Sequence, residues 1–139
     1  MRVVFDTNVL VSMLLFKGRL SALFDLVASG ELTLCFTPKT LNEFRFVLSR
    51  KKFATALSSV GLDVDLVLKA LEPHSMIFSD PEGVIDLIQD DPSDNAFLGC
   101  ALASSATYLV SGDRHVLAFS QFGKTSIISP KNFMEEIDV

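Results

Sequence analysis

Four acidic residues stand at positions in this sequence where a folded chain could bring them together: Asp6, Glu43, Asp94 and Asp113. Carboxylates held within a few ångströms of one another repel, which raises the pKa of at least one of them. A divalent cation removes that penalty, and an oxygen-only ligand set suits Mg²⁺ or Mn²⁺ rather than zinc. The residues alone therefore indicate a divalent metal and a phosphate-like substrate, with no nucleophilic side chain required.

Asp6 and Asp113 each follow a predicted strand. Residues 2–5 form a short apolar run that ends directly before Asp6, and residues 107–111 form another that Gly112 separates from Asp113. In an open parallel sheet, ligands bind at the carboxyl ends of the strands, near the point where the strand order reverses. If these two strands are neighbours, we expect the two carboxylates to meet at one rim of the sheet.

Asp94 and Glu43 belong to predicted helices. The first helix begins at Asp91-Pro92 and reaches about Ser105, and Asp94 stands at the head of its most apolar stripe. The second runs from Thr37-Pro38 to about Arg50, with Phe46 and Val47 three and four residues after Glu43. We therefore expect both acids to share a face with apolar residues and to be directed toward the sheet.

Each acid also has a structural alternative. Asp6 and Asp113 could cap the helices that follow them, and Glu43 could be a surface acid. Asp94 could favour the helix dipole in the first turn, and Asp91 with Asp94 resembles a capping box. Asp91 could instead bind a second cation beside Asp94.

The other predicted elements alternate between strands and helices along the whole chain, which favours an α/β fold with a mostly parallel sheet covered by helices on both faces. No linker or repeat is evident, so residues 1–139 are expected to form a single domain. Cys35 and Cys100 lie in apolar runs, which indicates buried thiols. No signal peptide or membrane-spanning run is evident, and a cytoplasmic protein is expected.

At this point the sequence resembles the PIN-domain family, through four short motifs that occur in the family's order over nearly the whole chain. The motifs are Val3-Val4-Phe5-Asp6-Thr7-Asn8-Val9, Leu41-Asn42-Glu43-Phe44, Asp90-Asp91-Pro92-Ser93-Asp94-Asn95 and Val110-Ser111-Gly112-Asp113-Arg114. The resemblance implies a three-layer, doubly wound sheet of about five strands. It also implies a Mg²⁺- or Mn²⁺-dependent endoribonuclease that cleaves single-stranded RNA, and many small bacterial members are toxins of toxin–antitoxin pairs.

The resemblance assigns the metal-binding and catalytic roles to Asp6, Glu43, Asp94 and Asp113. Asn8 and Ser111 match positions that orient the acidic cluster by hydrogen bonds. An antitoxin protein is then an expected partner, and the sequence also permits a homodimer.

RNA binding needs positive charge, but the net charge of the chain is −5. The basic cluster Arg45, Arg50, Lys51 and Lys52 could form a track for the RNA backbone, or could only favour the C-terminus of its helix. Arg114, next to Asp113, could also contact a phosphate. Bound cations would supply the remaining positive charge.

Two other functions remain open from the sequence. A strand ending in Asp6 is also found in haloacid-dehalogenase-type phosphatases, but those usually carry a second aspartate where this chain has Asn8. The domain could also bind RNA or a protein without cutting it.

Overall fold

A six-stranded sheet forms the centre of the protein, in a computed structural model that describes residues 1–15, 19–83, 87–88 and 94–139. The strand order is β3-β2-β1-β4-β6-β5, and all described pairs are parallel except β5 with β6. The strands are β1 (Arg2–Phe5), β2 (Thr33–Phe36), β3 (Ser75–Ile77), β4 (Tyr108–Val110), β5 (Gln121–Phe122) and β6 (Thr125–Ile128).

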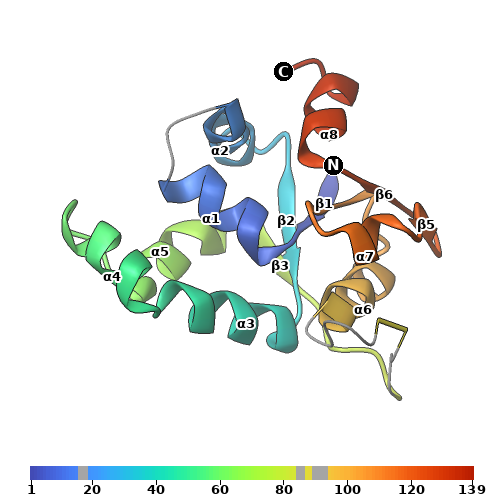
Figure 1. Ribbon diagram of the computed structural model, residues 1–139, viewed down its shortest axis with the longest axis horizontal. Coiled ribbons are helices and arrows are strands. Elements are labelled where there is room, and N and C mark those ends of the chain that lie inside the picture. The colour runs from blue at the N-terminus through green and yellow to red at the C-terminus, as the bar shows by residue number, and fades with distance from the viewer. Residues whose placement is uncertain (16–18, 84–86, 89–93) are drawn as a thin grey trace.

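Helices cover both faces of the sheet, because successive side chains of a strand point to opposite sides. On β1, Val3 and Phe5 pack into one hydrophobic cluster and Val4 into another. The first cluster is completed by α1 (Thr7–Leu15), α2 (Ala22–Ala28), α3 (Pro38–Leu48), α4 (Lys51–Ser58), α5 (Val64–Leu71) and α8 (Pro130–Glu136). The second is completed by α6 (Asp94–Ser104) and α7 (Arg114–Leu117) (Figure 1).

The strand order reverses between β1 and β4. From β1 the chain builds outward through β2 to β3, and it then returns to the other side of β1 to form β4 and β6. Val3 pairs with Tyr108 and Phe5 with Val110, so the carboxyl ends of β1 and β4 lie side by side. This is the type of position where ligands bind in open α/β sheets.

The predicted fold class is confirmed. The sheet has six described strands where about five were expected, because the two-residue β5 adds an antiparallel edge through a turn at Gly123, whose φ is +59°. Thr37-Pro38 begins α3 as predicted, and the side chains and backbones of Thr37 and Thr40 form a reciprocal capping box. Asp91-Pro92, the expected start of the next helix, lies outside the described residues, within which α6 begins at Asp94.

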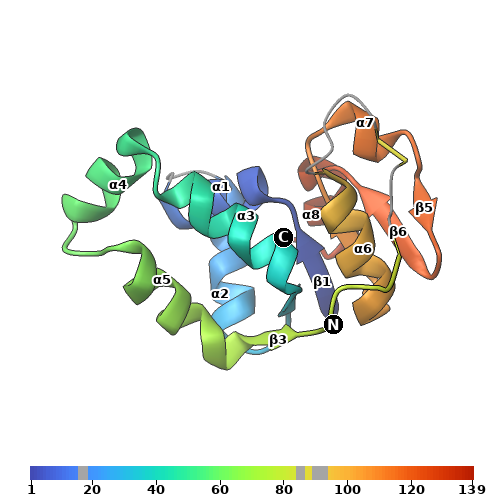
Figure 2. The ribbon, with the colours of Figure 1, turned by 90° about the horizontal axis from the view of Figure 1, so that it is seen from below.

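Helices α4 and α5 extend away from the sheet on the side opposite β5 (Figure 1, Figure 2). Two short 3-10 helices, Arg19–Ser21 and Glu72–His74, lead into α2 and β3. Cys35 and Cys100 are buried free thiols, as predicted. Within the described ranges, no helix has the length and apolar character needed to cross a bilayer.

Candidate functional site

The four predicted acids line one pocket, at the rim where β1 and β4 end. Its volume is about 290 Å³. Asp6 comes from the end of β1, Glu43 from α3, Asp94 from the start of α6 and Asp113 from the start of α7. The described lining consists of Asp6, Thr7, Asn8, Glu43, Val47, Arg50, Asp94, Phe97 and Asp113.

Asp6 is held by hydrogen bonds on both of its carboxylate oxygens. Oδ1 accepts from the backbone N–H of Val9 at 2.9 Å, so Asp6 does cap α1. Oδ2 accepts from the hydroxyl of Ser111 at 2.5 Å, and the backbone N–H of Asp6 donates to the carbonyl of Val110 at 3.0 Å. Capping and membership of the acidic pocket are therefore compatible roles for this residue.

Ser111 connects Asp6 to Asp113. Its Oγ donates to Asp6 and accepts from the backbone N–H of Asp113 at 3.0 Å. Asp113 caps α7 in turn, because its Oδ1 accepts from the N–H of His115 at 2.7 Å. The side chain of Asn8, which was expected to orient the cluster, lines the pocket and is exposed, and it makes no hydrogen bond among the described residues.

Burial and the neighbouring charge of Asp113 raise the pKa of Asp6. Burial is the largest cause, since only 5% of Asp6 is exposed. The hydrogen bonds from Ser111 and from the backbone of Val9 and Gly112 lower the pKa in part, and the charge of Asp113 raises it further. Ionised Asp6 therefore lacks compensating positive charge in the described structure.

The chemistry of the pocket fits a hard divalent cation. Its acidic side chains offer only oxygen atoms, and Asp6, Glu43 and Asp113 form no ion pair with a described residue. Thr7 Oγ1 is buried at the wall of the pocket without a hydrogen-bond partner in the described part of the chain. No three His, Cys, Asp or Glu side chains of that part are already arranged around one metal position. A cation with several retained waters, as Mg²⁺ prefers, suits such an open set.

The reason given for the orientation of Glu43 was partly wrong. Val47 is buried and lines the pocket, but Phe46, expected on the same buried face, is 63% exposed. The buried face of α3 is set by Thr40, Phe44, Val47 and Leu48. Glu43 lies at the edge of that face, half-buried, and this position brings it to the pocket.

The predicted basic cluster is divided by the structure. Arg50 lines the acidic pocket. Arg45 instead forms an ion pair with Asp65 at 2.7 Å, in a separate groove between α3, α5 and β3. Lys51 lines a different hollow on α4, and Lys52 Nζ lies 4.9 Å from the ring centre of Phe53.

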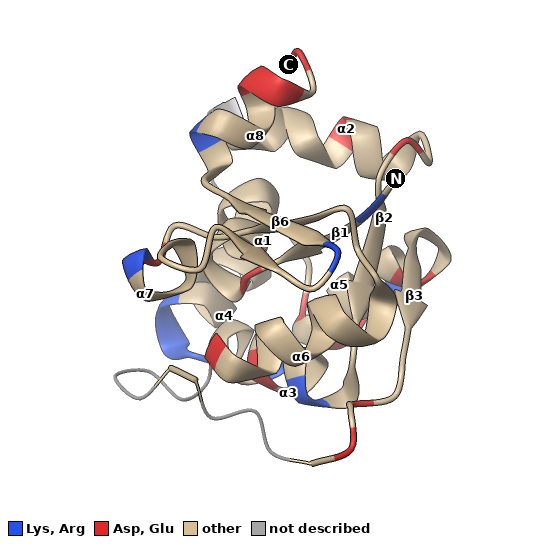
Figure 3. Ribbon diagram, turned by 90° about the vertical axis from the view of Figure 1, so that its right-hand side faces the viewer, with Lys and Arg blue, Asp and Glu red and all other residues tan. Residues whose placement is uncertain are grey.

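Arg114 is exposed at the start of α7 and is outside the described lining of the pocket. In the view of Figure 3, basic positions at the start of α4 and on α7 lie on the same side of the molecule as acidic positions of α3 and α6. Asp91, the predicted alternative ligand, lies outside the described residues.

Two residues near the site had no role in the sequence-based prediction. Thr7 has no predicted role beyond its place in the first motif. Because it directly follows the acid at the end of a strand, its position in the sequence indicates that it lies at the same rim. Asn95 is buried; its Oδ1 accepts from the N–H groups of Leu87 and Ile88, and its Nδ2 donates to the carbonyl of Ile88. Asn95 thus fixes the backbone of residues 87–88 next to the start of α6. These are contacts from a side chain to backbone groups seven and eight residues earlier, and no sequence motif predicts them.

Comparisons with known proteins agree with this architecture. A family model described as "PIN domain" matches residues 2–115. The crystal structure of PAE2754 from Pyrobaculum aerophilum superposes with a TM-score of 0.57 at 18% identity, covering 99% of this chain and 90% of that one. The crystal structure of VapBC2 from Rickettsia felis, bound to a DNA fragment from its promoter, gives a TM-score of 0.57 at 17% identity. The match covers 93% of this chain and 98% of that one. A search of curated proteins finds no match.

Proposed function

The chain belongs to the PIN-domain family, and from this premise we propose that it is a divalent-metal-dependent endoribonuclease that cleaves single-stranded RNA and is the toxin of a toxin–antitoxin pair. The observation that supports the proposal most is the convergence of Asp6, Glu43, Asp94 and Asp113 on one pocket from four separate elements. The match to the PIN-domain family favours a nuclease over the haloacid-dehalogenase-type phosphatase.

Asp6, Asp94 and Asp113 would hold Mg²⁺ or Mn²⁺, with Glu43 binding it directly or through water. When bound, such a cation supplies a water nucleophile at neutral pH and stabilises charge on the phosphate oxygens. The protein's own contribution is to fix these carboxylates. Ser111 fixes Asp6 relative to Asp113, and burial keeps bulk water away from Asp6.

Glu43 has a different position from the other acids. It projects from within α3, whereas the other three stand at the end of a strand or at the start of a helix. Glu43 and Asp113 are half-buried where Asp6 and Asp94 are buried, and one oxygen of Asp113 already accepts from the N–H of His115. We assign to it, besides water-mediated metal binding, the acceptance of a proton from the attacking water. A carboxylate with access to solvent can pass that proton on, which a fully enclosed one cannot.

The test is cleavage of defined single-stranded RNAs by the purified protein, with and without Mg²⁺ or Mn²⁺, comparing wild type with Asp6→Asn. We expect cleavage that requires the metal and is lost in the variant. Asp25→Asn is a matched control, because Asp25 is an exposed carboxylate on α2, away from the pocket lining. Equal cleavage by wild type and Asp6→Asn would contradict the proposed site.

The partner in this proposal is an antitoxin protein. Its support is the likeness in fold to the Rickettsia felis VapBC2 structure, together with the family. Induced expression of the wild-type chain in a bacterium should stop growth, and expression of Asp6→Asn should not. If expression of the active nuclease does not affect growth, the toxin assignment is wrong and the nuclease assignment still holds.

A further inference from the structure

Phe46 is exposed although it stands in the last turn of α3, between residues that pack against the core. Its 63% exposure exceeds the 42% of Phe24, the other phenylalanine among the strongly exposed hydrophobic residues of the described chain. Burying a phenylalanine contributes roughly 1.5–3 kcal/mol, a gain that this position forgoes. Single exposed hydrophobic residues are common, so exposure alone assigns no role.

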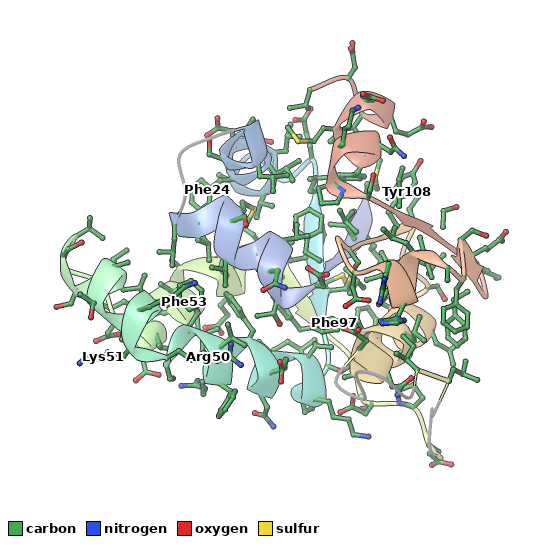
Figure 4. The ribbon with its side chains drawn as sticks, viewed as in Figure 1. Phe24, Arg50, Lys51, Phe53, Phe97 and Tyr108 are labelled. Atoms are coloured by element: carbon green, nitrogen blue, oxygen red, sulfur yellow. The ribbon has the colours of Figure 1, made fainter. Side chains whose placement is uncertain are left out.

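Arg50 links Phe46 to the acidic pocket. The guanidinium carbon of Arg50, the residue that precedes α4, lies 5.6 Å from the centre of the Phe46 ring. Arg50 is also part of the pocket lining. Figure 4 shows Arg50 where α3 passes into α4. An exposed ring, a guanidinium and four carboxylates thus form one continuous surface.

The charges of this surface select the kind of ligand. Arg50 forms no ion pair with a described residue, whereas the nearby Arg45 is paired with Asp65. Arg50 is also the sole described cationic side chain in the pocket lining. Its guanidinium is therefore available to an anion from outside, and the planar fork suits a phosphate.

From this geometry we propose that Phe46 and Arg50 form a nucleotide subsite for single-stranded RNA, next to the phosphate that is cut. The base stacks on the exposed ring of Phe46, and Arg50 binds the phosphate that leads into the pocket. Bases that are free of a duplex stack well on aromatic and guanidinium planes, and every base has such a face. The inference rests on the proposed function, whose scissile phosphate lies at the acids.

The first test is the kinetics of RNA cleavage by Phe46→Ala. We expect KM to rise roughly 5- to 150-fold, the range that loss of one stacked base produces, with kcat nearly unchanged. Phe46→Tyr should restore the wild-type KM, because tyrosine keeps the ring. Arg50→Lys should retain part of the affinity that Arg50→Ala loses.

Two controls separate the subsite from general effects. Phe24→Ala removes an exposed phenylalanine from α2, which Figure 4 shows apart from Arg50, and Lys131→Ala removes an exposed cation from α8. Both should cleave like wild type. Phe46 and Arg50 are exposed, so melting curves of their variants should match wild type and exclude misfolding.

The decisive experiment changes the RNA as well as the protein. Replacing one nucleotide beside the cut by an abasic residue should raise KM for the wild type and have no further effect in Phe46→Ala. Additive effects of the two changes, or equal KM for wild type and Phe46→Ala, would overturn the subsite while leaving the nuclease intact.

If the wild type cleaves no RNA with either metal, the proposed function fails. The subsite can then be tested separately by fluorescence anisotropy, which measures the affinity of each variant for a labelled single-stranded RNA in the presence of Ca²⁺. Weaker binding by Phe46→Ala than by Phe24→Ala supports the subsite, and equal binding overturns it.

Discussion

Replacing Asp6 by Asn separates its electrostatic role from its role in the fold. Asn keeps a carbonyl oxygen for the N–H of Val9 and presents an NH₂ group to Ser111 Oγ, so both contacts have neutral counterparts. Each charge-assisted bond, worth about 1.5–3 kcal/mol, becomes one of about 1 kcal/mol. Against this, the desolvation penalty of a buried ion, several kcal/mol, disappears.

The metal-free Asp6→Asn protein should therefore be as stable as wild type at neutral pH, or up to about 2 kcal/mol more stable. The sign of the pH dependence follows from the raised pKa of Asp6. A group with a raised folded pKa contributes stability below its unfolded pKa of 3.8, and that stability is lost as pH rises through the folded value. The stability advantage of Asp6→Asn should therefore be absent below pH 3.8 and should grow as the pH rises from 3.8 through the folded pKa of Asp6.

The assay is urea unfolding of both proteins in EDTA, from acid to neutral pH, followed by melting curves with Mn²⁺. A metal at 100 times its dissociation constant adds about 2.7 kcal/mol to a protein that binds it, so wild type should gain several degrees in Tm and Asp6→Asn should not. An Asp6→Asn protein clearly less stable than wild type at neutral pH would refute the view that Asp6 carries an uncompensated charge.

Three further outcomes test the elements around the pocket. Thr37→Ala removes the capping box of α3 and should lower the free energy of unfolding by about 1 kcal/mol in urea titrations. Asn95→Ala removes two buried hydrogen bonds and one partly buried one, and it should lower the free energy of unfolding by about 2–3 kcal/mol in the same titrations, whereas a surface substitution such as Lys131→Ala should not. Burial raises the pKa of Cys100 to about 12, so its thiol should react with Ellman's reagent only when the protein unfolds.

The elements of the fold were largely predictable because their signals are local. The apolar run of β1 ends at a polar residue, and Thr37-Pro38 carries a hydroxyl cap and a proline suited to a first helical turn. The pairing of β1 with β4 could not be predicted from such local signals. It depends on which strands pair across about 100 residues, and the sequence supplied it only through the expected fold class.

The side chains around the pocket were less predictable than the four acids. Helical spacing placed Phe46 with Val47 on an apolar face, but one helix can carry an apolar residue just outside its buried sector. Proximity in sequence likewise grouped Arg45 with Arg50, although Arg45 on α3 and Arg50 between α3 and α4 line different grooves. Which residue faces which pocket depends on packing against α5 and α6, which sequence spacing does not specify.

The excess of acid explains how RNA binding and metal binding would depend on each other. Four carboxylates line the pocket, with Arg50 as the cation of its described lining, so a phosphate entering without metal meets net negative charge. A bound divalent cation places positive charge where the phosphate enters, so the phosphate is attracted and not repelled. By linkage, RNA that binds better to the metal-loaded protein must raise its metal affinity by the same factor. A chain with a net charge of −5 can then bind RNA where the cation and the Phe46–Arg50 subsite meet, without a basic surface elsewhere.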